Sequence, residues 1–71
     1  DTDLDALKTE VGGYITSVKN NPDKTLTKKL GELYAEKGFK EKNPMKYTDK
    51  EALKEVRDAI VTWAENLGIT L

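Results

Sequence analysis

The sequence contains no cysteine and no histidine. Without cysteine no disulfide can form, and without either residue the usual structural zinc sites are excluded. Neither residue is available for acid–base or nucleophilic chemistry near neutral pH, and the chain has no glycine-rich phosphate loop and no nucleophile motif. We therefore expect a protein that is not an enzyme and that holds no cofactor and no metal.

Long apolar runs are also missing, and no stretch approaches the roughly 20 apolar residues that a membrane span needs. With 71 residues the chain is long enough for one domain, residues 1–71. Apolar residues make up 37% of the chain, so the core must come from their side chains alone. The absence of an initiator methionine at Asp1, together with the absence of cysteine, is compatible with an exported or excised domain. The compartment stays open.

The first helix is predicted over residues 3–19, because apolar residues alternate there at spacings of three and four. It should end before Pro22, since proline disfavours helical geometry in the residue that precedes it. The stripe consists of Leu4, Leu7, Val11, Tyr14 and Val18.

The second helix is predicted to begin at residue 22 or 24 and to end at Lys37. Either Asn21 or Asp23 should cap its first turn. Gly38 should end it, because glycine readily adopts the left-handed backbone that closes many helices. Its apolar stripe consists of Leu26, Leu30, Leu33 and Tyr34.

The third helix is predicted from a capping box, Thr48-Asp49-Lys50-Glu51, to about Leu67, with Gly68 as its stop. Trp63 is in register with the apolar stripe, so we expect it in the core. The stripe consists of Leu53, Val56, Ile60, Trp63 and Leu67. No segment has the period of two that a strand requires. The expected fold is therefore all-α, an antiparallel three-helix bundle (up-down-up) with a longer connector between the second and third helices.

Phe39, Met45 and Tyr47 gather in this connector, and connectors tend to run over the surface. Aromatic residues and methionine are favoured at protein interfaces, so the three residues are candidates for a partner-binding patch. The alternative is that they cover the end of the bundle, since so small a protein needs its apolar groups for the core.

Two adjacent glycines, Gly12 and Gly13, lie inside the first predicted helix. Each costs roughly 1 kcal/mol relative to alanine in a helix interior. One interpretation is a notch where the backbone or a side chain of a partner comes close. The other is a tolerated kink or a site of fraying.

Positive charge is concentrated in the middle of the chain, where residues 24–54 carry nine lysines and five acidic residues. Such a segment can contact phosphates, which makes nucleic-acid binding the alternative function. Base readout relies on arginine, asparagine and glutamine, and the only arginine, Arg57, lies outside the segment. The candidate anion-binding residues are Lys28, Lys29, Lys40 and Lys42.

The opening Asp1-Thr2-Asp3-Leu4-Asp5 places acidic residues at the first, third and fifth positions of a calcium loop. The sixth and twelfth positions hold Ala6 and Gly12 instead of the required glycine and glutamate, so a calcium site is not predicted. The preferred interpretation is a small non-catalytic protein-interaction module, possibly cut from a larger chain. Its partner is expected to be another protein, and no small-molecule substrate is inferred.

Overall fold

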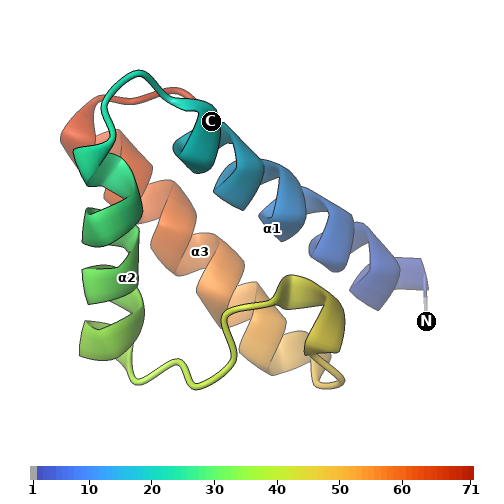
Figure 1. The fold of residues 1–71 in the computed structure, drawn as a ribbon. Coiled ribbons are helices and arrows are strands. Elements are labelled where there is room, and N and C mark those ends of the chain that lie inside the picture. The colour runs from blue at the N-terminus through green and yellow to red at the C-terminus, as the bar shows by residue number, and fades with distance from the viewer. Residues whose placement is uncertain (1) are drawn as a thin grey trace.

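The computed structural model describes residues 2–71 (Figure 1). Helix α1 spans Thr2–Asn20, α2 spans Thr25–Lys37 and α3 spans Lys50–Leu67, and a single 3-10 turn, η1, spans Pro44–Lys46. Within the described residues there are three α-helices and no strand, which confirms the all-α prediction. Helix α1 exceeds its predicted limits by one residue at each end.

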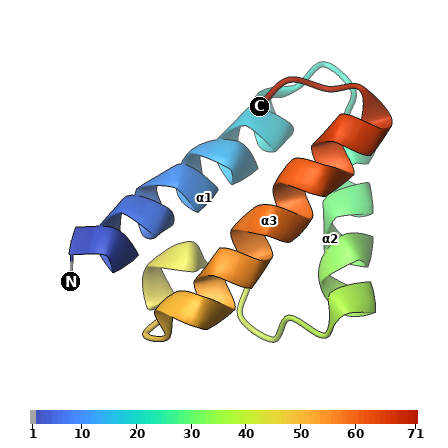
Figure 2. The same ribbon diagram turned by 180° about the vertical axis from the view of Figure 1, so that it is seen from behind.

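Helices α1 and α3 lie side by side and run in the same direction, towards the side of the molecule that carries the point marked C (Figures 1 and 2). Helix α2 starts at that side and runs back. Helix α1 packs against α3, η1 and α2. Helices α2 and α3 diverge towards the end of α2 (Figure 2), and the connector of residues 38–49 spans the gap.

The core lies between the three helices and is apolar throughout. Helix α1 contributes Leu7, Val11 and Val18. All four residues predicted for the second stripe are buried, and in α3 the buried residues are Leu53, Val56, Ile60 and Ala64.

The other two residues of the predicted third stripe are not in the core, contrary to expectation. Trp63 is half-buried against the core's edge, and Leu67 is 41% exposed. The chain turns at Gly68, and Ile69 and Leu71 then pack against the core as partly buried residues.

Both predicted glycine stops adopt the left-handed conformation, with φ of 74° at Gly38 and 71° at Gly68. After Gly38, the Phe39 N–H donates to the Tyr34 carbonyl at 2.9 Å. The two rings then meet edge to face, with centroids 5.5 Å apart. Gly38 thus folds the start of the connector back onto α2.

The helix starts differ from the predictions by a few residues. Helix α2 begins only at Thr25, because the Asp23 carboxylate accepts hydrogen bonds from the Thr25 N–H at 3.0 Å and from its hydroxyl at 2.6 Å. Helix α3 is capped by Asp49, whose carboxylate accepts from the Glu51 N–H at 3.0 Å, and not by Thr48. In both helices the carboxylate of an aspartate accepts a hydrogen bond from the backbone N–H of the residue two positions later.

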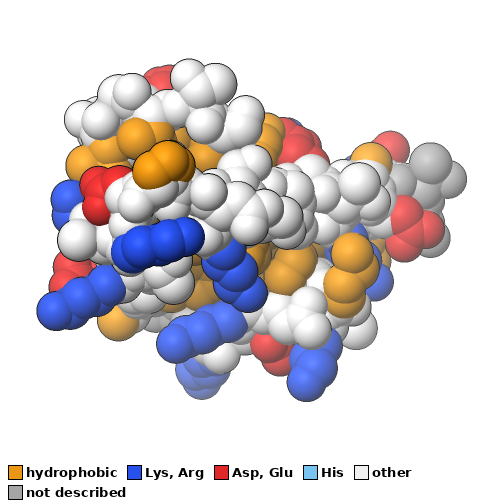
Figure 3. Space-filling model, turned by 45° about the horizontal axis from the view of Figure 1, so that its top comes forward, with side chains coloured by type: hydrophobic (Ala, Val, Ile, Leu, Met, Phe, Trp, Pro, Cys, Tyr) orange, Lys and Arg blue, Asp and Glu red, His pale blue; other side chains and the backbone are white. Residues whose placement is uncertain are grey.

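The molecular surface is rich in charge and uneven. Figure 3 shows lysine and arginine side chains spread over the left and lower parts of one face, with apolar and acidic side chains among them. The four candidate anion-binding lysines are all exposed, Lys28 and Lys29 on α2 and Lys40 and Lys42 on the connector.

Candidate functional site

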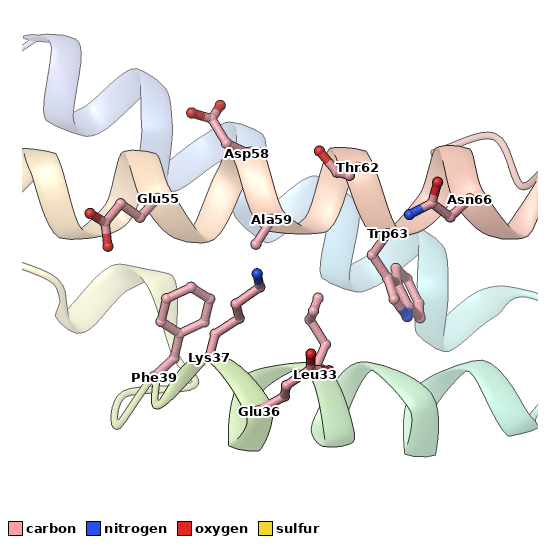
Figure 4. A pocket seen from close by; sticks show the side chains of 10 residues that line it. All are labelled: Leu33, Glu36, Lys37, Phe39, Glu55, Asp58, Ala59, Thr62, Trp63 and Asn66. Carbon is pink, nitrogen blue, oxygen red and sulfur yellow. The ribbon is translucent and has the colours of Figure 1, made fainter.

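A groove of about 590 Å³ lies between α2 and α3, where the two helices diverge (Figure 4). One wall comes from α2 and from Phe39 just after its stop, and the other comes from α3. The lining residues are Leu33, Glu36, Lys37, Phe39, Glu55, Asp58, Ala59, Thr62, Trp63 and Asn66.

The floor of this groove, which we call the α2–α3 groove, is apolar. Leu33 is buried, and Phe39, Ala59 and Trp63 are each half-buried with part of their surface open to the groove. Figure 4 shows the methyl group of Ala59 directed towards α2, between Phe39 on one side and Trp63 on the other. Two aromatic side chains therefore flank a shallow centre made by a small residue.

The edges of the α2–α3 groove are charged. Three carboxylates, Glu36, Glu55 and Asp58, and one ammonium group, Lys37, line it. Figure 4 shows Lys37 reaching from α2 towards α3. Among the described residues Lys37 forms no ion pair, while the Asp58 carboxylate lies 2.8 Å from Nε of Arg57. The edges thus carry more negative than positive charge.

The three connector candidates lie in different places. Phe39 lines the α2–α3 groove, whereas Met45 is 57% exposed next to α1. Tyr47 packs against the core, and its hydroxyl donates to the Glu41 carbonyl at 2.7 Å. The aromatic residue that joins Phe39 in the groove is Trp63. The helical period placed Trp63 in the core, and no signal in the sequence pointed to the divergence of α2 and α3 that exposes it.

Gly12 lies where η1 crosses α1. A Cβ atom at Gly12 would be 3.9 Å from Cγ of Pro44 and 4.0 Å from Cε of Met45. Gly13 faces open space. At Gly12 the nearest atoms thus belong to the protein's own connector and lie at ordinary van der Waals distance, so a methyl group would fit there.

The acidic start of α1 gathers no metal ligands in the part of the chain that the structure describes. Asp1 lies outside the described residues. The Asp3 carboxylate lies 2.9 Å from the Lys50 ammonium, and this contact lowers the pKa of Asp3. No group of three or more potential ligands (His, Cys, Asp or Glu) is found in residues 2–71.

The tyrosines differ in their surroundings. Burial raises the pKa of Tyr34 to about 12, with a smaller contribution from Tyr47. The hydrogen bond that Tyr14 donates to Glu10 raises the pKa of Tyr14. Both effects favour the neutral phenol in the folded protein.

The Tyr34 shift predicts a loss of stability at alkaline pH. An unfolded tyrosine ionises near pH 10, so the stabilisation is complete below that value and declines as the pH rises towards the folded pKa of about 12. Urea unfolding between pH 9 and pH 12 should show this decline. Tyr34→Phe should flatten it, whereas Tyr14→Phe should leave the Tyr34 contribution in place. An equally steep decline in Tyr34→Phe would contradict this assignment.

No protein-family model matches the chain, and comparisons with characterised proteins and with solved structures find no match. No helix in the described residues has both the length and the apolar character for crossing a membrane. The functional argument therefore rests on the geometry and charge of the surface itself.

Proposed function

We propose that this chain is a small non-catalytic protein-interaction module, free-standing or part of a larger chain. Its three helices act as an antiparallel up-down-up bundle, and the α2–α3 groove receives an amphipathic helix of a partner protein. The observation that carries this proposal is the pair of half-buried aromatic residues, Phe39 and Trp63, on either side of an open apolar floor.

The shape of the groove supports a helical partner. Amphipathic helices bind by laying an apolar stripe into a groove between two helices, with anchor residues one turn apart. Phe39 and Trp63 would pack on either side of such a stripe, and Ala59 leaves room between them. Tryptophan is among the residues that contribute most to binding energy at interfaces.

The charge of the groove supports a basic partner. Glu36, Glu55 and Asp58 line the edges against a single lysine, so lysine or arginine residues beside the partner's apolar stripe would face carboxylates. Complementary charges of this kind mainly accelerate association and reject unsuitable partners.

The test uses a designed helical peptide with leucine at one-turn spacing, lysines beside the leucines and no tryptophan. Trp63 is the only tryptophan in the chain, so its fluorescence reports binding at the groove. Ala59→Phe fills the floor and should weaken binding about tenfold or more. Ala35→Phe, the same change at an exposed position of α2 outside the groove, should have little effect.

A second peptide, with glutamates in place of the lysines, checks the role of charge. We expect it to bind more weakly, and we expect salt to reduce the difference between the two peptides. If Ala59→Phe binds the lysine peptide as tightly as the parent does, the α2–α3 groove is not the binding surface.

Nucleic-acid binding through residues 24–54 is the alternative function. It is favoured by the solvent access of Lys28, Lys29, Lys40 and Lys42, none of which forms an ion pair among the described residues. Against it, the chain has a net charge of −1, and acidic residues interrupt the basic segment.

An electrophoretic shift with mixed duplex and single-stranded DNA separates the two functions. We expect only weak retardation that disappears as salt rises, because phosphate contacts of this kind are strongly salt-dependent. A sequence-dependent shift at physiological salt, abolished by changing the four lysines to glutamate, would favour the alternative and contradict the interaction-module proposal.

A further inference from the structure

A second, smaller cavity of about 240 Å³ lies on the other side of α2, between α2, α1 and the connector. We call it the α1–α2 pocket. Its lining includes two lysines and no carboxylate. The lining residues are Ile15, Lys19, Thr27, Leu30, Gly31, Tyr34 and Lys42.

The two lysines come from different elements and reach the same cavity. Lys19 belongs to the last turn of α1, and Lys42 belongs to the connector. Neither forms an ion pair among the described residues. The Lys24 ammonium lies 3.4 Å from the Lys19 carbonyl oxygen, which brings a third positive charge to this end of α1. An anion entering the α1–α2 pocket would therefore be attracted by several cations.

Tyr34 supplies a polar group beside these charges. The residue is 3% exposed, and its hydroxyl has no hydrogen-bond partner among the described residues. Among the described residues, every side-chain oxygen or nitrogen that is fully shielded from solvent has a hydrogen-bond partner. The Tyr34 hydroxyl has none, so it retains some contact with solvent. Tyr34 is one of the residues that line the α1–α2 pocket. A buried hydroxyl in this position is available to donate to a ligand.

Apart from Thr27, the remaining lining residues of the pocket carry no polar side chain. Ile15 and Leu30 supply aliphatic walls. A Cβ atom at Gly31 would meet no atom within 4 Å, so the absence of a side chain there leaves the cavity unfilled. The volume lies below the roughly 300–1,000 Å³ of pockets for drug-sized ligands, which favours a small ligand.

We propose that the α1–α2 pocket binds a small aliphatic carboxylate, with its carboxylate held by Lys19 and Lys42 and its chain against Ile15 and Leu30. The Tyr34 hydroxyl donates to the same carboxylate. This site is separate from the α2–α3 groove and does not depend on the function proposed for that groove.

Sodium octanoate is the probe, and the backbone amide signals of ¹⁵N-labelled protein report where it binds. We expect saturable shifts at Gly31 and Lys42. Acetate carries the charge without the chain, and 1-octanol carries the chain without the charge. Both should bind about tenfold more weakly, because each lacks one half of the recognition. Equal binding of 1-octanol and octanoate would overturn the proposal, as would the absence of saturable octanoate binding.

Variants on the two sides of the pocket test the assignment of residues. Changing both Lys19 and Lys42 to glutamine should weaken octanoate binding about tenfold, since two charge-assisted contacts are lost. The matched control changes Lys28 and Lys29 to glutamine, which removes the same charge outside the pocket and should alter binding by less than about twofold. If the two double variants bind alike, the pocket lysines do not hold the carboxylate.

Gly31→Leu should block the pocket, while Gly31→Ala serves as its control for helix propensity. Circular dichroism shows whether each variant keeps its helices. Ala59→Phe should leave octanoate binding unchanged, which separates this site from the α2–α3 groove. Unchanged octanoate binding in a folded Gly31→Leu variant would overturn the proposal.

Discussion

Ile60→Ala is expected to lower the free energy of unfolding by roughly 2–5 kcal/mol. Ile60 has no exposed surface and lies in the cluster where all three helices meet. The substitution removes buried methyl and methylene groups and leaves a cavity that a close-packed interior closes only in part. Small domains have total stabilities near the low end of about 5–15 kcal/mol, so a large fraction of this variant should be unfolded at about 37 °C.

Urea unfolding followed by circular dichroism measures the effect. Lys54→Ala, at an exposed position of the same helix, is the control and should change stability by less than about 0.5 kcal/mol. A midpoint for Ile60→Ala equal to that of the parent would show that α3 does not pack as described.

Replacing both Gly12 and Gly13 with alanine is expected to stabilise the protein by up to about 2 kcal/mol, since each glycine costs roughly 1 kcal/mol in a helix interior. The structure has room for both methyl groups. A methyl group at position 12 would make ordinary contacts with Pro44 and Met45 at 3.9 and 4.0 Å, and position 13 is open. In a domain of this size each kcal/mol raises the melting temperature by about 4–8 °C.

Thermal unfolding of the two single variants and the double variant measures this gain. Gly38→Ala is the opposite control, because φ at Gly38 is 74° and the left-handed conformation costs a residue with a Cβ roughly 1–2 kcal/mol. A lower melting temperature for Gly12→Ala would mean that η1 approaches α1 more closely than the structure shows.

Local chemistry made the helices predictable from the sequence. Gly38 and Gly68 end their helices in the predicted conformation, and the stripes of α1 and α2 supply most of the buried residues. The caps were less predictable, because Thr48 and Asp49 can each satisfy a free N–H and only the backbone decides between them. Asp49 does so, with an extended backbone at φ −103°.

The candidate site was harder to predict because it depends on how the helices diverge. A helical period identifies one side of α3 but does not show how much of that side α2 covers. Phe39 was a candidate from its place in the connector, whereas Trp63 was assigned to the core. In the same way, nothing in the spacing of Lys19 and Lys42 indicated that they line one cavity.

The packing of α1 against α3 also bears on the order in which the molecule folds. The two helices come from opposite ends of the chain, so their contact closes a loop that contains all of α2 and the connector. Contacts between distant parts of a chain form late, because the entropy of loop closure opposes them. When α2 leaves the ribosome, the core residues of α1 still lack the α3 residues that share their cluster, among them Leu53 and Ile60. Of the three helices, α3 is synthesised after the other two, and it therefore completes the core that they share.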